Sequence, residues 1–240
     1  MRCLFGGVLA LAPLVACSSL AEPPGVRWQV GDDRAPAGPI LDTAAEAAAA
    51  AGHPRLAERG AGRELRIWLG FGLQPFLTYV RIVEDAAGVQ GELLAVWDEQ
   101  PGATCGEATR DRTAGLPCGE LRMSGQQVAC VLAPTRVIDW AALLRSLERQ
   151  HIRDLRDQSH LPDYQAAHDG MCVAVGLREG ARWRRYMHCN PWYQRYDDAR
   201  RAGAIADLLL DLVPAYIEAM PWDPPPVGEA PAVCRTAEAS

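Results

Sequence analysis

Apolar and polar residues alternate along the chain from residue 63 onward, a spacing typical of β-strands. Leu65, Ile67 and Leu69 alternate with polar or bulkier neighbours, which is the period of a strand with one buried face. Two runs rich in aromatic and β-branched residues follow at 76–83 and 89–97, and a short turn sequence containing glycine separates them. These three segments predict an antiparallel meander.

Three further strands are predicted in the second half of the chain. Residues 127–132 form one short apolar run. The clearest hairpin is formed by residues 171–177 and 182–189, with Glu179 and Gly180 at its turn.

Two helices complete the predicted domain. Apolar residues recur at helical spacing after Asp139, which is a suitable N-cap, and again after Asp197. We therefore predict an α+β domain over residues 63–220. Its antiparallel sheet has about six strands, its two main helices pack on one face, and disulfides staple it.

The segments that flank this domain have compositions typical of linkers. Residues 17–62 are rich in Pro, Gly and Ala and are expected to form a tether. A capping box at 43–46 predicts one short helix in the tether, and we expect its weakly apolar face to lie outside the core. Residues 221–240 form a Pro-rich tail.

The first residues have the pattern of an export signal. Met1-Arg2 is followed by an apolar run that is shorter than the roughly 20 residues a membrane-spanning helix needs. The run ends in Leu14-Val15-Ala16-Cys17, which resembles the lipobox of bacterial lipoproteins. The resemblance implies removal of signal peptide 1–16, a diacylglycerol on the sulfur of Cys17 and an acyl chain such as palmitate on its amino group. Ser18 in the next position favours an outer membrane location facing the periplasm.

Export places the remaining cysteines in an oxidising compartment, where an even number predicts disulfide bonds. Alternation along the predicted hairpin places Cys172 and Cys189 on opposite faces, so a direct bridge between them would need a bulge. We favour Cys130–Cys189 in the core and Cys172–Cys234 outside it, with Cys105–Cys118 stapling the long loop at 98–126.

Composition excludes several functions. The chain has 24 basic and 30 acidic residues, so its net charge of −6 argues against a nucleic-acid partner. All basic residues are arginines, which excludes a Schiff-base or phosphate-loop lysine. No signature of a serine hydrolase, zinc protease or EF-hand occurs, and we expect no cofactor.

Histidines suggest one catalytic alternative. His160, His168 and His188 lie near one another in sequence, with Asp163 and Asp169 among them. Histidine and aspartate are zinc ligands, and an open site would activate water in a metal-dependent envelope hydrolase. The competing interpretation is an ordinary polar loop, because Asp and Gly before a strand are typical turn residues.

An arginine- and tyrosine-rich segment suggests a binding surface. Alternation places several of its side chains on one face of the predicted hairpin, beside an aromatic loop, and Trp, Tyr and Arg are the residues enriched in interface hot spots. The alternative is that the aromatic residues pack under the last helix while the arginines are solvated. The candidate partner-binding residues are Arg182, Arg184, Arg185, Tyr186, Trp192, Tyr193 and Arg195.

These features together predict a membrane-tethered envelope protein that binds a protein or glycan partner and is not an enzyme. An inhibitor or immunity protein is the specific form that we favour. A metal-dependent hydrolase and a structural envelope-assembly lipoprotein are the alternatives.

Overall fold

The computed structural model describes residues 26, 28–30, 39–58, 62–70, 77–98, 118–124, 127–132, 138–164, 170–218 and 234–236. Its strands are β1 (Gln29–Val30), β2 (Arg63–Gly70), β3 (Leu77–Asp85), β4 (Gly88–Asp98), β5 (Cys118–Ser124), β6 (Gln127–Leu132), β7 (Cys172–Glu179), β8 (Arg182–Cys189) and β9 (Cys234–Thr236). Its helices are α1 (Pro39–Ala50), α3 (Trp140–Arg149) and α4 (Asp197–Glu218), with short 3₁₀ helices η1 (Gln158–His160) and η2 (Pro191–Tyr193).

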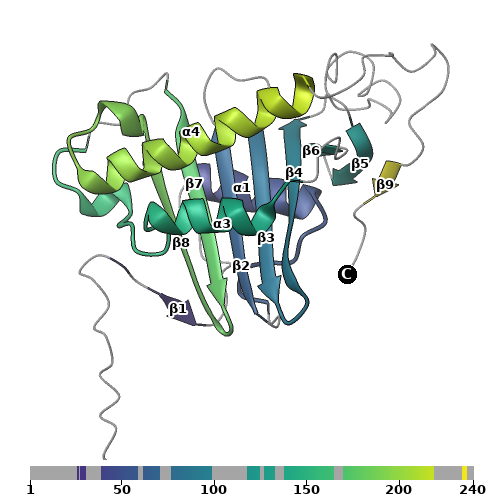
Figure 1. The fold of residues 1–240 in the computed structure, drawn as a ribbon, viewed down its shortest axis with the longest axis horizontal. Helices are drawn as coiled ribbons and strands as arrows, with labels where there is room; N and C mark the ends of the chain where they lie inside the picture. Colours follow the sequence, from purple (N-terminus) through teal and green to yellow (C-terminus); the bar gives the residue numbers. More distant parts are fainter. Residues whose placement is uncertain are drawn as a thin grey trace, which may run out of the picture.

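The described strands form one sheet in the order β1-β8-β7-β2-β3-β4-β6-β5-β9 (Figure 1). Neighbouring strands are antiparallel except β5 and β9, which pair in parallel. The predicted α+β class with an antiparallel sheet is confirmed. The predicted count of about six strands is too low, because β1, β5 and β9 lie in segments predicted to be a tether, a loop and a tail.

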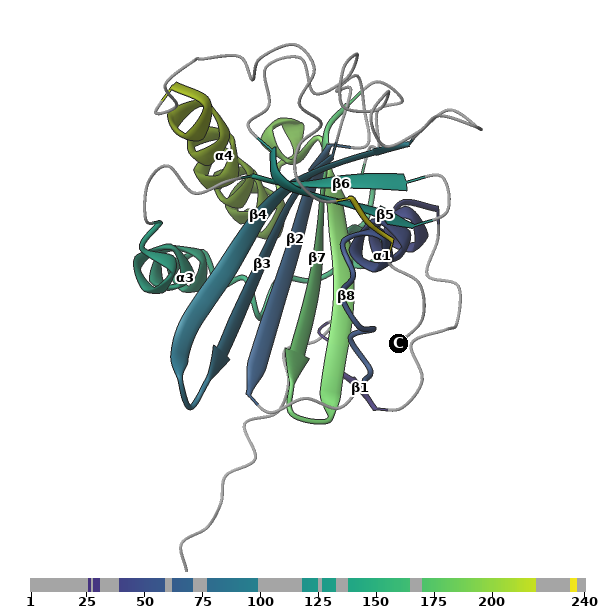
Figure 2. The ribbon, with the colours of Figure 1, turned by 90° about the vertical axis from the view of Figure 1, so that its right-hand side faces the viewer.

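Helices cover both faces of the sheet rather than one, as Figure 2 shows. The helices α3 and α4 lie on the same face, where the apolar stripes of Leu143, Leu144 and Leu147 from α3 and Ile205 and Leu209 from α4 are part of the main core. The N-cap residue of α3 is Asp139, as the sequence predicts, and its side chain accepts a hydrogen bond from the backbone N–H of Ala142.

The helix α1 packs on the opposite face, so the expectation that it lies outside the core is wrong. Its buried alanines, among them Ala44 and Ala47, contact Trp68, Tyr79 and Leu94 of the sheet. The rings of Trp68 and Tyr79 stack with their centroids 5.1 Å apart. Small side chains let the helix approach these large rings closely, so a weakly apolar helix face still forms a core. The folded domain therefore begins before residue 63 and includes α1 and β1.

The register of β7 and β8 corrects the predicted cysteine pairing. Cys172 lies directly opposite Cys189, and the two form a disulfide with their Cα atoms 3.9 Å apart. This pairing excludes both Cys130–Cys189 and Cys172–Cys234. Cys105 lies outside the described residues, so the predicted Cys105–Cys118 bridge does too. The register also pairs Ala174 with Met187, so both cysteines lie on the face of Ala174 and Met187, and the direct bridge needs no bulge.

Candidate binding surface

The predicted partner-binding residues do not form one surface. Arg184 and Tyr186 are 1% and 0% exposed, because the register places them with Val175 and Leu177 on the face that α3 and α4 cover. The prediction that these two side chains lie on an exposed face is therefore wrong. They belong to the core.

The two buried side chains hydrogen-bond to the backbone that follows α3. The Arg184 guanidinium donates to the carbonyl oxygens of Arg153 at 2.6 Å and Leu155 at 2.5 Å. The Tyr186 hydroxyl donates to the carbonyl oxygen of Ile152 at 2.6 Å. An arginine can be buried here because its terminal N–H groups donate to backbone carbonyl oxygens, which offsets part of the cost of desolvating the guanidinium.

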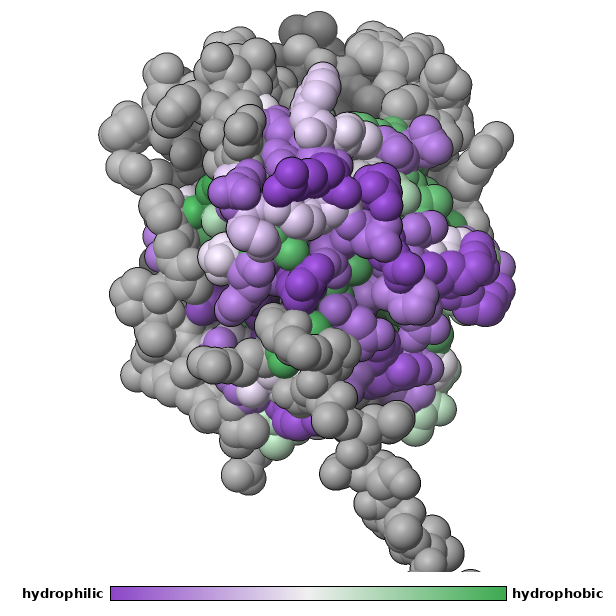
Figure 3. Space-filling view, turned by 90° about the vertical axis from the view of Figure 1, so that its left-hand side faces the viewer, coloured by the Kyte–Doolittle hydropathy of each residue, from purple (hydrophilic) through white to green (hydrophobic). Residues whose placement is uncertain are grey.

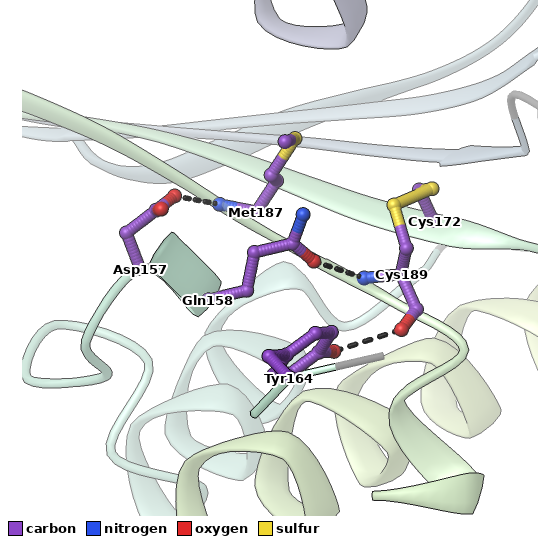
Figure 4. The surroundings of a disulfide bond; sticks show 6 residues. All are labelled: Asp157, Gln158, Tyr164, Cys172, Met187 and Cys189. Carbon is purple, nitrogen blue, oxygen red and sulfur yellow. Dashed lines mark hydrogen bonds between the residues drawn. A yellow bond between two sulfur atoms is a disulfide. The ribbon is translucent and has the colours of Figure 1, made fainter. Parts of the chain in front are cut away.

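The same loop covers the outer edge of β8 further along the strand, as Figure 4 shows. The Asp157 carboxylate accepts a hydrogen bond from the Met187 N–H at 2.9 Å, and Gln158 Oε1 accepts one from the Cys189 N–H at 2.8 Å. The Tyr164 hydroxyl donates to the Cys189 carbonyl oxygen at 2.8 Å. We call Asp157, Gln158 and Tyr164 the edge clamp, since their side chains occupy backbone groups that a further strand would use.

Arg182 and Arg185 lie away from the remaining candidates. Arg182 is exposed at the tip of the β7–β8 hairpin, where its guanidinium lies 5.1 Å from the centre of the Trp28 ring. Arg185 is partly buried on the α1 face, with its guanidinium 5.4 Å from the centre of the Trp183 ring. The length of β8 separates Arg182 at the hairpin tip from the aromatic residues that follow the strand.

Trp192, Tyr193 and Arg195 lie close together in the sequence after β8, and we call them the aromatic platform. Trp192 is 40% and Tyr193 86% exposed, and they are the exposed large hydrophobic residues of the described part of the chain. Both belong to η2, which begins at Pro191, a suitable first helical residue. The platform therefore follows the disulfide-bonded Cys189 by a few residues.

The turn between the disulfide and the platform has a defined conformation. Asn190 is buried and adopts a left-handed backbone conformation with φ of 49°. Its N–H donates to the Met171 carbonyl oxygen at 2.8 Å. Its side chain fills the space beside Gly170, where an added Cβ would lie 1.5 Å from Asn190 Oδ1. These contacts fix the direction in which the chain leaves β8.

The Trp192 ring is held against α4. Its Nε1 donates to Asp207 Oδ1 at 3.0 Å, and an added Cβ at Gly203 would lie 3.1 Å from the ring. Gly203 thus lets the ring approach the helix closely, although glycine in a helix interior costs about 1 kcal/mol relative to alanine. The indole is oriented before any partner arrives.

Charged side chains that follow Tyr193 in the sequence form ion pairs. Arg195 lies 3.5 Å from the Asp163 carboxylate, and its guanidinium stacks over the Tyr196 ring. Arg200 pairs with Asp197 one turn into α4. Figure 3 shows that the face carrying the β8 edge and the N-terminal end of α4 is dominated by hydrophilic side chains.

The histidines predicted as metal ligands have other surroundings. His188 is buried, and its Nε2 is 2.8 Å from the Arg156 carbonyl oxygen. Burial lowers the pKa of His188. His160 is exposed on η1, whereas His168 lies outside the described residues. In the described part of the chain no group of three His, Cys, Asp or Glu side chains could hold a metal ion.

A buried charge cluster on the α1 face of the sheet was not found from the sequence. Glu64 Oε1 accepts hydrogen bonds from the Nε atoms of Arg66 and Arg81, both at 2.8 Å, and Glu64 Oε2 accepts one from Arg178 at 2.9 Å. Burial raises the pKa of Glu64, but the three guanidinium groups outweigh it and hold the pKa at about 2. Alternating charges on β2 indicated a solvated face, which is why sequence analysis missed the cluster.

His53 connects the end of α1 to the sheet. Its Nδ1 lies 2.8 Å from the Tyr79 hydroxyl and its Nε2 3.0 Å from Glu92 Oε2. Burial lowers the pKa of His53, although the hydrogen bond to Glu92 acts in the opposite direction. Since Tyr79 is fully buried beside the Trp68 ring, this group anchors the segment after α1 to the sheet.

Comparison of the chain with known protein families, with curated proteins and with solved structures finds no match. Among the described helices, none is both long and apolar enough to cross a membrane.

Proposed function

We propose that this protein is a lipid-anchored, non-catalytic binding protein of the bacterial envelope, and that the aromatic platform is its binding site. The observation that carries the proposal is the exposure of Tyr193 on a rigid support. An aromatic ring left 86% exposed gains no burial energy in the free protein. It gains that energy when a partner covers it, as hot-spot residues do.

Rigidity of the support strengthens the proposal. The Cys172–Cys189 disulfide, the left-handed Asn190 and the Trp192–Asp207 hydrogen bond fix the segment that leads into Tyr193. A preorganised site loses less conformational entropy when it binds than a mobile loop does. An inhibitor or immunity protein that captures a lytic enzyme near the membrane is the specific role that we favour.

A capture experiment tests this role. The tagged protein is incubated with solubilised envelope, and bound protein and glycan are quantified for wild type, Tyr193→Ala and Arg182→Ala. We expect Tyr193→Ala to lower capture about tenfold or more and Arg182→Ala, at the other end of β8, to retain it. Equal capture by all three proteins would contradict the assignment of the platform as the binding site.

Anchoring is tested separately by mass spectrometry of the native protein. The proposal requires the mature chain to begin at Cys17 with a diacylglycerol thioether and an acylated amino group. A native protein that retains residues 1–16, or that has an unmodified thiol at position 17, would contradict the envelope location.

A further inference from the structure

We propose that two copies of this protein associate through the outer edge of β4, where residues 88–92 pair in antiparallel fashion with the same residues of a second copy. This surface is separate from the aromatic platform, so the association does not depend on the proposed function.

Only part of β4 is paired on its outer side. The strand runs from Gly88 to Asp98, whereas its pairing with β6 begins at Leu94. Figure 2 shows the half of β4 nearer the β3–β4 turn at the margin of the sheet, with no described strand beside it.

This half of β4 directs unpaired backbone groups outward. Asp85 and Gly88 pair with each other across the tight turn between β3 and β4, so the N–H and C=O groups of Gly88 point toward β3. Because successive residues of a strand direct these groups to opposite sides, those of Val89 and Gly91 point away from β3. No described residue forms a hydrogen bond with these outward groups.

The outer edge of β8 is protected, in contrast to that of β4. The edge clamp and β1 occupy the outward groups of β8 at both ends of the strand. Residues 88–91 of β4 include no charged residue and no proline, and their register with β3 is unbroken. Charges, prolines and bulges are the features that keep a strand edge from pairing, and this segment has none of them.

The register of β4 with itself is favourable about a two-fold axis through Gln90. Val89 then lies opposite Gly91 of the second copy, so their outward backbone groups bond to each other on both sides of the axis. Gln90 faces Gln90, and the two amides can hydrogen-bond. Glu92 faces Gly88, so no like charges are opposed.

An apolar contact accompanies this pairing on the α3 face. The Trp140 ring lies against Gly91, where an added Cβ would be 2.4 Å from the ring. Trp140 and Val89 are both partly buried and pack against the main core. Since Val89 of one copy faces Gly91 of the other, its methyl groups lie beside the second Trp140 ring, and both groups lose contact with water.

Cross-linking at the axis tests the inference on the full-length, detergent-solubilised protein. Gln90→Cys should form an intermolecular disulfide in air, because the two facing residues form the closely spaced type of antiparallel pair. Cys172 and Cys189 face each other in this way in β7 and β8 and are bonded. Ala87→Cys, at an exposed position of the same hairpin but away from the axis, is the matched control and should remain monomeric on a non-reducing gel.

Charge exchange at the axis provides an independent test. Gln90→Glu and Gln90→Arg should each raise the dissociation constant of the dimer about three- to fivefold, since like charges then face each other. An equal mixture of the two variants should associate at least as tightly as wild type. Ala87→Glu adds the same charge off the axis and should not change the constant. Sedimentation equilibrium up to about 300 μM measures it, because an interface this short is expected to be weak.

The outcomes separate self-pairing from its alternatives. Wild type that stays monomeric over the whole series, with no cross-link at position 90, overturns the inference. Dimerisation that Gln90→Glu and the mixture leave unchanged also overturns it. Loss of captured envelope protein in Gln90→Glu, without any dimer in wild type, would assign the β4 edge to a strand of another protein and overturn self-pairing.

Discussion

The carboxylate of Asp157 accepts a hydrogen bond from the backbone N–H of Met187, so a side chain takes the place of a neighbouring strand at the outer edge of β8. Gln158 does the same at Cys189. The short β1 pairs only with the other end of β8, at Trp183 and Arg182. The edge clamp therefore protects the part of β8 that β1 leaves uncovered.

Removal of the clamp should make the protein self-associate. An unprotected strand edge is a template for pairing with another chain, so Asp157→Ala combined with Gln158→Ala should increase the dimeric and larger species. Sedimentation velocity over a concentration series measures the change. Asp154→Ala, which alters an exposed residue of the same loop, is the control. A double variant that stays as monomeric as this control would contradict the role of the clamp.

Loss of the buried guanidinium should destabilise the fold strongly. Arg184→Met keeps much of the side-chain volume but leaves the carbonyl groups of Arg153 and Leu155 without their donor. We expect the free energy of unfolding to fall by about 3 kcal/mol. Arg182→Met at the exposed hairpin tip should change it by less than about 0.5 kcal/mol. Urea denaturation of both variants measures the difference, and similar values for the two would show that Arg184 is not needed in the core.

Glu64 should control stability in acid. Its pKa of about 2 lies below the ordinary value of 4.5, so its contribution to the free energy of unfolding is complete above pH 4.5 and is lost as the pH falls toward 2. Glu64→Gln should cost about 3 kcal/mol at neutral pH, because three arginines lose their carboxylate. The difference in the free energy of unfolding between this variant and wild type, measured by denaturant titration, should become smaller below pH 4.5.

Exposed Glu58 provides the matched control for that experiment. Glu58→Gln should follow wild type at every pH. A gap between Glu64→Gln and wild type that stays constant down to pH 2 would show that the carboxylate does not titrate with the low pKa stated above.

His53 should make the protein less stable in mild acid. Its pKa is lowered from 6.5 in the folded protein, so the unfolded chain binds the proton more tightly, and stability is lost as the pH falls below 6.5. The free energy of unfolding should therefore decrease between pH 7 and 5, and the decrease should be smaller in His53→Gln. His188, whose pKa is also lowered by burial, accounts for part of the remaining slope. The control is His160→Gln at an exposed position, which should show the same decrease in the free energy of unfolding as wild type.

The disulfide should stabilise the fold and the platform together. Cys172→Ala with Cys189→Ala opens a loop with a sequence separation of 17 residues, for which chain entropy predicts a loss of about 3 kcal/mol. Thermal denaturation of the oxidised proteins measures the loss. Peptide mapping that finds either cysteine bonded to another partner in wild type would contradict the pairing.

The positions of several strands and helices could be predicted because their patterns are local. The alternation at Leu65, Ile67 and Leu69 and the apolar stripe after Asp139 depend on residues within one strand or helix. The hairpin that turns at Gly180 depends only on its own two strands and a residue that tolerates φ of 58°. Trp192 and Tyr193 were singled out because a run of aromatic residues is a local feature of the sequence, although their exposure is not.

The faces could not be predicted, because they depend on what covers them. The sequence determined that Arg184 and Tyr186 share one side of β8, and the structure agrees. Only the tertiary structure decided that this side is buried, since it is the loop after α3 that supplies the carbonyl groups these side chains need. In the same way α1, through its alanines, turned the second face of the sheet into a core around Trp68 and Tyr79. Local periodicity records which residues point the same way. Whether that direction is inside or outside is a property of segments distant in sequence.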